Sequence, residues 1–82
     1  NNMDKSIILE ELSEIVKDIL GKDSICLFMK TTASDIDGWD SLTHVKILYE
    51  CELKWNIKLS FEELSRLNCV GDLVELIYKI EH

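Results

Sequence analysis

The sequence predicts an all-α fold, a four-helix bundle of three longer helices and one short helix, with a long loop between helices one and two. Three segments repeat apolar residues at spacings of three and four, the period of a helix with one buried face. A capping-box pair announces the short helix. The chain has 82 residues, is 46% hydrophobic and lacks proline, which suffices for one modest core. We therefore expect a single domain over residues 1–82, with Asn1 and Asn2 outside the fold.

The first helix is expected from Asp4 to Leu20. Asp4 or Ser6 can accept hydrogen bonds from the first free N–H groups, and Gly21 stands where a left-handed residue often ends a helix. Charged side chains fill the face that should meet water. The apolar face consists of Ile8, Leu12, Ile15, Val16 and Ile19.

The second helix is expected to begin after Asp40 and to end near Trp55 or Asn56. Before it, Gly21–Trp39 form a connection longer than the roughly 12 to 15 residues usual in a compact domain. A crossover of that length would let the first two helices run parallel. Ser24–Met29 can be briefly extended. The apolar side chains that can anchor the loop are Ile25, Leu27, Phe28, Ile36 and Trp39.

Two further helices follow. Glu63 stands three residues after Ser60, the spacing of a capping box, so a short third helix is expected over Ser60–Leu67. The last helix is expected from about Val70 to the end of the apolar periodicity near Ile80. Its cap would be Asn68 or Cys69, and cysteine is a poor cap.

Composition excludes several function classes. The formal net charge of -7 would repel a polyanion, so nucleic acid is not an expected partner. No apolar run approaches the roughly 20 residues of a membrane-spanning helix, and no signal peptide is visible. Three widely spaced cysteines are expected to be reduced thiols and not disulfide or zinc partners. We expect a soluble, cytoplasmic monomer that does not insert into membranes.

The most informative segment is Gly38–Leu42, where the long loop enters the second helix. If Asp40 caps the helix, Ser41 occupies its first position, beside unpaired N–H groups and the positive end of the helix dipole. A phosphate group is favoured there, and the Asp40 carboxylate could hold a divalent cation during its transfer. Asp40 with Asp35 and Asp37 could also form a cation site near the loop. The plain alternative is that this pair only caps the helix.

Two neighbours of Ser41 have ordinary explanations. Trp39 precedes the cap and can pack on His44 at the fourth helical position, as a hydrophobic staple. Ser41 and His44 lie three apart on one helical face, but the sequence offers no third residue to orient the imidazole and no strained nucleophile turn. We therefore expect no enzyme, and a solvent-facing or partner-contacting His44.

The chain strongly resembles the acyl carrier proteins, which hold acyl groups as thioesters on a 4′-phosphopantetheine arm. The resemblance spans nearly all of residues 4–81, and Gly38–Leu42 match the family's G-x-D-S-L attachment motif. It implies that a phosphopantetheinyl transferase attaches the arm from coenzyme A to Ser41, with Asp40 assisting the Mg²⁺-dependent transfer. It also implies that the second helix docks partners. The matching positions beyond the motif are Val45, Ile47, Leu48, Trp55–Ile57, Glu62, Glu63, Leu67, Val70 and Ile77.

The resemblance further implies an acyl-chain cavity inside the bundle and partners that fill and empty it. The partners would be an acyl- or aminoacyl-activating ligase, a synthase or a transferase, in fatty acid, polyketide or a more specialised biosynthesis. The side chains that could line the cavity are Val45, Leu48, Cys51, Leu64 and Leu67.

The second helix departs from the fatty-acid-synthesis members in its charge. Acids are often found in the family where this chain has Thr43, Lys46, Leu53 and Lys54. Docking should then depend less on charge and more on shape, and the expected docking residues are Trp39, Leu42, Thr43, His44, Val45, Tyr49 and Glu52. The alternatives are an aminoacyl, peptidyl or D-alanyl carrier, or a helical protein-interaction module that is never modified.

Overall fold

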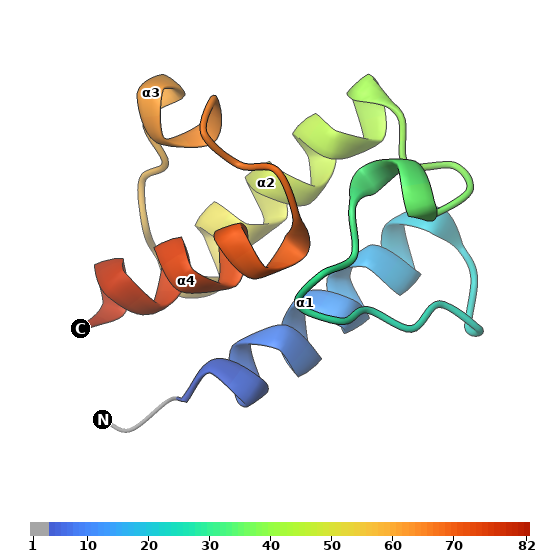
Figure 1. Cartoon of the computed structure of the whole chain (residues 1–82), viewed down its shortest axis with the longest axis horizontal. Coiled ribbons are helices and arrows are strands. Elements are labelled where there is room, and N and C mark those ends of the chain that lie inside the picture. Colours follow the sequence, from blue (N-terminus) through green and yellow to red (C-terminus); the bar gives the residue numbers. More distant parts are fainter. Residues whose placement is uncertain (1–3) are drawn as a thin grey trace.

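The computed structural model describes residues 4–82, so the expectation for Asn1 and Asn2 lies outside the described residues. Within residues 4–82 the chain forms helices and no strand, which confirms the all-α prediction (Figure 1). None of these helices is long and apolar enough to cross a membrane. The elements in order are α1 (Lys5–Leu20), the 3-10 helix η1 (Ala33–Asp35), α2 (Ser41–Trp55), α3 (Phe61–Leu64) and α4 (Val70–Glu81).

Both ends of α1 form as the sequence predicts. The Ile7 backbone N–H donates to the Asp4 carboxylate at 3.0 Å, and the Ser6 hydroxyl donates to the same oxygen at 2.7 Å. Asp4 is therefore the cap and Ser6 supports it. At the other end Gly21 has a left-handed φ of 66°, and its N–H closes on the Lys17 carbonyl.

The core lies where α1 meets α2 and α4. The three fully buried α1 side chains repeat every four residues, so α1 presents one continuous apolar stripe. Ile15 and Ile19 flank this stripe and are only partly buried. The core side chains of the three long helices are Ile8, Leu12 and Val16; Ile47, Leu48, Cys51 and Trp55; and Val70, Leu73, Val74 and Ile77.

The expected parallel arrangement of the first two helices is wrong: α1 and α2 are antiparallel (Figure 1). Lys22, just after α1, pairs with Asp37, just before α2, at 3.3 Å. Near the opposite end of α2, Lys54 lies 3.8 Å from Glu11. The long loop leaves the end of α1, contacts the start of α4 and returns close to the end of α1, where α2 begins. Its length is therefore explained by this contact with α4 and not by a crossover between parallel helices.

The loop is held by backbone hydrogen bonds that the sequence did not reveal. The first N–H groups of α4, those of Val70 and Gly71, donate to the carbonyls of Thr31 and Met29, each at 2.7 Å. These bonds satisfy helix N–H groups that Cys69, the N-cap residue, leaves without a side-chain partner. The loop therefore acts as the cap of α4.

The loop anchors were predicted with one error. Leu27 is buried, and Ile25, Ile36 and Trp39 are partly buried against the core, but Phe28 is 64% exposed. Phe28 opens a tight turn in which its N–H donates to the Thr31 hydroxyl at 2.9 Å. This turn leaves the Phe28 ring outside the core.

The short helix α3 begins as predicted and ends early. Ser60 and Glu63 form the reciprocal capping box, with the Glu63 N–H donating to the Ser60 hydroxyl at 3.1 Å. The helix ends at Leu64 and not at Leu67. Beyond Leu64 the chain makes single turns, and the N–H of Leu67 donates to the carbonyl of Leu64, three residues back instead of four. α3 is therefore one helical turn followed by a connector to α4.

The three cysteines are free thiols in different environments. Cys26 is exposed, Cys69 is partly buried, and Cys51 is fully buried in the core. Burial raises the pKa of the Cys51 thiol to about 12, and the neighbouring Glu50 and Glu52 charges act in the same direction. Cys51 therefore stays a neutral thiol and packs as a small apolar residue.

We expect alkylation of the native protein at about pH 8 to label Cys26 and to spare Cys51, because the thiolate is the nucleophile. Intact mass before and after unfolding in denaturant, where all three thiols should react, measures this. Labelling of Cys51 at the Cys26 rate in native protein would contradict the burial.

The raised pKa of Cys51 also predicts how stability depends on pH. Above an unfolded-state pKa of 9.0 only the unfolded chain loses the Cys51 proton, so the free energy of unfolding should fall by about 1.4 kcal/mol per pH unit until the folded-state pKa is reached.

Candidate functional site

Ser41 opens α2, directly after the cap that the sequence predicts. Asp40 is extended, its carboxylate accepts from the Thr43 N–H at 2.9 Å, and its carbonyl accepts the first helical bond from the His44 N–H at 2.8 Å. The Thr43 backbone N–H, with a smaller effect of the Thr43 side chain, lowers the pKa of Asp40. A fixed negative charge therefore stands one residue before Ser41.

The Ser41 side chain is exposed at the end of the helix that concentrates positive partial charge. Within residues 4–82 no protein group hydrogen-bonds the Ser41 hydroxyl, whereas the neighbouring Asp40 carboxylate is occupied by the cap. The hydroxyl is therefore free to react, and the helix terminus favours an anionic group bonded to it.

A shallow groove of about 620 Å³ adjoins Ser41. One of its walls is the start of α2 and the other is η1, the short helix that the sequence analysis missed. Its volume falls within the range of sites that bind small organic molecules. The residues lining this groove, which we call the Ser41 groove, are Ala33, Ser34, Trp39, Asp40, Ser41, His44 and Val45.

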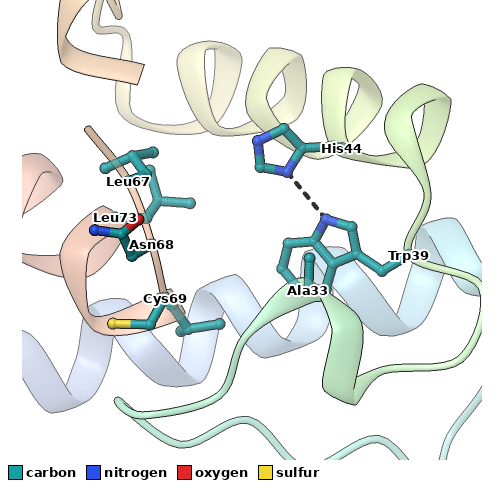
Figure 2. A pocket seen from close by; sticks show the side chains of 8 residues that line it. Ala33, Trp39, His44, Leu67, Asn68, Cys69 and Leu73 are labelled. Atoms are coloured by element: carbon teal, nitrogen blue, oxygen red, sulfur yellow. Dashed lines mark hydrogen bonds between the residues drawn. The ribbon is translucent and has the colours of Figure 1, made fainter. Parts of the chain in front are cut away.

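Trp39 and His44 form a hydrogen-bonded pair at one end of the Ser41 groove. The Trp39 indole N–H donates to His44 Nδ1 at 3.0 Å, and the ring centroids lie 6.1 Å apart (Figure 2). The two residues hold the positions of a hydrophobic staple, as predicted, but a polar bond joins them. His44 is half-buried, and its expected contact with a partner stays a prediction. Both side chains are directed at one another and belong to the groove wall.

Behind this pair lies a second, smaller cavity of about 70 Å³, which we call the inner pocket. Figure 2 shows the pair on one side of it and the connection from α3 to α4 on the other. Its lining is mostly apolar, with Asn68 as an exception. The residues around the inner pocket are Ala33, Trp39, His44, Leu67, Asn68, Cys69, Val70 and Leu73.

The residues predicted to line an acyl cavity divide among three places. Leu67 lines the inner pocket, and Cys51 lies in the core and lines neither cavity. A surface groove between α2 and α3 contains the others, Val45, Leu48 and Leu64, together with Tyr49, Glu52 and Leu59. Val45 also lines the Ser41 groove. No local sequence pattern marks the far wall of the inner pocket, because it comes from a connector without periodicity.

The outward face of α2 carries an apolar stripe. Leu42, Val45 and Tyr49, all predicted docking residues, are 65%, 62% and 58% exposed. Leu53, at 59%, continues the stripe at helical spacing and was not predicted to dock. Thr43 and Glu52 lie elsewhere: Thr43 completes the cap, and the Glu52 carboxylate accepts from the Leu59 N–H at 2.8 Å.

The expected cation site at Asp35, Asp37 and Asp40 does not form. Each carboxylate has its own partner: Asp35 accepts from the Thr32 N–H at 2.9 Å, Asp37 pairs with Lys22, and Asp40 caps α2. No cluster of three metal-ligating side chains occurs in the part of the chain that the structure describes. The three aspartates alternate along the sequence, but this spacing does not bring their carboxylates together, because η1 and the cap of α2 direct them to different partners.

No protein-family model matches the chain, but individual proteins do. An acyl carrier protein of Rhodococcus erythropolis is 37% identical over 75 residues, which covers 90% of this chain and 81% of that protein. The chain belongs to the acyl carrier protein family. A meromycolate extension acyl carrier protein of Mycolicibacterium aurum is 36% identical and covers 90% of this chain and 76% of the relative.

A solved structure supports the same family. The solution structure of a holo acyl carrier protein from Geobacter metallireducens superposes with a TM-score of 0.81 at 41% identity, covering 87% of this chain and 82% of the other. This acyl carrier protein therefore shares both sequence and fold with its relatives, and acyl carrying is its general function.

Proposed function

We propose that Ser41 carries a 4′-phosphopantetheine arm and that the chain shuttles acyl groups between partner enzymes. The observation that carries the proposal is the exposed Ser41 hydroxyl, which no group among residues 4–82 hydrogen-bonds, at the start of α2 beside the ionised Asp40. The Ser41 groove would hold the arm, whose terminal thiol supplies the thioester chemistry. Membership of the acyl carrier protein family supports this assignment.

Loading requires a phosphopantetheinyl transferase and coenzyme A. The Ser41 oxygen forms a bond to the phosphorus that bears pantetheine, the pyrophosphate bond breaks, and adenosine 3′,5′-bisphosphate leaves. The hydroxyl proton passes to a base of the transferase. The helix N-terminus stabilises the phosphodiester that remains on Ser41.

The proposal is tested by intact mass. We expect incubation with a broad-specificity transferase, Mg²⁺ and coenzyme A to add the mass of one phosphopantetheine group, and fragmentation to place it on Ser41. Omission of coenzyme A is the control. An unchanged mass with a transferase that loads another carrier in the same tube would overturn the proposal and leave an unmodified interaction module.

Asp40→Asn separates the two roles of Asp40. Asparagine still caps, so unfolding free energy should fall by less than about 1 kcal/mol, whereas the charge beside the transferred phosphate is lost. We expect the kcat/KM of loading to fall roughly 10- to 100-fold, because a ligand of the Mg²⁺ ion in the transferase complex is removed. Loading at the wild-type rate would show that Asp40 acts only as a cap.

We also propose that partner enzymes meet the apolar stripe of α2 and not an acidic helix. Within α2, Lys46 and Lys54 balance Glu50 and Glu52, although the whole chain has a net charge of -7. The fitting partner surface is an apolar groove with an uncharged or acidic rim, because a basic rim would meet no excess of negative charge on α2. Such a face favours a dedicated partner in a specialised pathway.

The transferase provides a first test of this face. Tyr49→Ala should raise the KM of loading severalfold, whereas Phe28→Ala, similarly exposed but on the loop, should leave it unchanged. The KM should also vary little with salt from about 0.05 to 0.5 M, because few charges cross the interface. A steep salt dependence with no effect of Tyr49→Ala would instead indicate docking by charge.

A further inference from the structure

We propose that the hydrogen-bonded pair of Trp39 and His44 closes the inner pocket off from the Ser41 groove and limits the cargo sheltered inside to acyl groups of about two to four carbons. The inference rests on the proposed attachment at Ser41, since it concerns what the arm carries. It identifies Trp39 and His44 as residues that determine cargo length.

The position of the pair supports this role. Trp39, His44 and Ala33 line both the Ser41 groove and the inner pocket, so these three side chains form the wall between them. An acyl chain that starts at the Ser41 groove must pass this wall to enter the inner pocket. In Figure 2 the two rings stand on the side of the pocket from which α2 begins, joined by their hydrogen bond.

The volume of the inner pocket sets the limit. A cavity of about 150 Å³ accommodates a benzene ring, with its six carbons, whereas the inner pocket has about 70 Å³. By this comparison the pocket has room for roughly three carbons beyond the thioester. Longer chains would have to displace a wall.

The α4 wall of the inner pocket cannot yield as easily as the pair. Leu73 and Val70 are 3% and 4% exposed and belong to the core. The start of α4 is also tied to the loop by the bond from the Val70 N–H to the Thr31 carbonyl at 2.7 Å. Opening the pocket toward α4 would break these contacts, whereas the pair forms the wall on the side of the Ser41 groove.

The pair itself is fixed from both sides. The Trp39 backbone N–H donates to the Ile36 carbonyl at 3.2 Å, and the His44 N–H makes the first helical bond to Asp40. Swinging either ring away would leave the half-buried indole N–H without its acceptor, which is unfavourable. The closed arrangement is therefore the resting state of this wall.

The test compares acyl groups of increasing length. Acetyl, butyryl, hexanoyl and octanoyl pantetheine arms are loaded onto Ser41 from the corresponding acyl-coenzyme A, and cleavage of the thioester by hydroxylamine is followed by intact mass. Each methylene that enters the pocket should slow cleavage about fourfold relative to the free acyl-coenzyme A. In wild type we expect this protection to rise up to butyryl and to stop there.

Variants of the pair should move that limit. Trp39→Ala and His44→Ala should extend protection to hexanoyl or octanoyl, and His44→Asn, which retains an acceptor for the indole N–H, should restore the wild-type limit. Phe28→Ala, an exposed aromatic residue on the loop outside the pocket and the docking stripe, is the control and should leave the limit unchanged. Circular dichroism of each variant shows that it is folded.

The outcomes separate this inference from the proposed function. If no variant and no wild-type protein accepts an arm, the attachment at Ser41 is wrong and the inference is lost with it. If all load, but wild type protects octanoyl more strongly than butyryl, or Trp39→Ala and His44→Ala both keep the wild-type limit, the attachment stands and the pair does not determine cargo length.

Discussion

Replacing Ser41 by alanine is expected to abolish loading with phosphopantetheine and to leave the fold intact. Ser41 supplies the exposed hydroxyl at the first position of α2 on which the proposed phosphodiester forms, and a carboxylate such as that of Asp40 cannot form one. Alanine is the best helix former, and Asp40 still caps the helix, so unfolding free energy should change by less than about 0.5 kcal/mol. Intact mass measures the first effect and thermal melting the second.

Ser34→Ala is the matched control for this experiment. Ser34 lines the same groove, but its hydroxyl is engaged with that of Thr32 at 3.0 Å, and it lies in η1 and not at the start of α2. We expect this variant to be loaded like wild type. If Ser41→Ala were still loaded, or if Ser34→Ala were no longer loaded, the attachment site would lie on the loop and not at Ser41.

Gly71→Ala is expected to destabilise the domain by about 1 to 3 kcal/mol, the cost of forcing atoms into an occupied space. A Cβ at position 71 would lie 2.6 Å from the backbone carbonyl oxygen of Met29, closer than such atoms can approach. That carbonyl accepts the hydrogen bond from the Gly71 N–H, so relieving the clash separates the loop from α4. The effect is measured by chemical denaturation and by faster hydrogen exchange at the amides of Val70 and Gly71.

The expected loss of stability in Gly71→Ala is opposite in sign to the usual effect of this substitution in a helix. In an unobstructed helix, alanine in place of glycine stabilises by about 0.5 to 1 kcal/mol, so a neutral or stabilising Gly71→Ala would refute the close contact. Gly21→Ala is the control. Gly21 has a left-handed φ of 66°, and a Cβ added there would meet no atom within 4 Å. The cost of Gly21→Ala therefore comes from backbone strain, and the amides at the start of α4 should keep their protection from exchange.

Residues that act through their immediate neighbours were predicted from the sequence. The caps at Asp4, Asp40 and Ser60 and the left-handed Gly21 all form as expected, because each depends on the backbone within a few residues. The apolar periodicities likewise located the three long helices and the buried face of α1, but on α2 the apolar residues at helical spacing, Leu42, Val45, Tyr49 and Leu53, are exposed. Ser41 was located by the same local logic, since the cap places it at the start of α2.

Features that depend on where distant segments meet could not be predicted in this way. The antiparallel order of α1 and α2, the exposed Phe28 and the separation of Asp35, Asp37 and Asp40 all depend on the path of the loop. That path is set by hydrogen bonds from α4 some forty residues away, which leave no periodic signal.

The sequence by itself therefore determined the three long helices, the side-chain caps at Asp4, Asp40 and Ser60, and the place of Ser41 at the start of α2. Only the tertiary structure decided what surrounds that serine: the groove completed by η1, the wall formed by Trp39 and His44, and the size of the inner pocket. The physical reason is the range of the interactions. Caps and helical periods act over one or two turns, whereas a pocket is the space left between elements whose positions depend on the packing of the whole core.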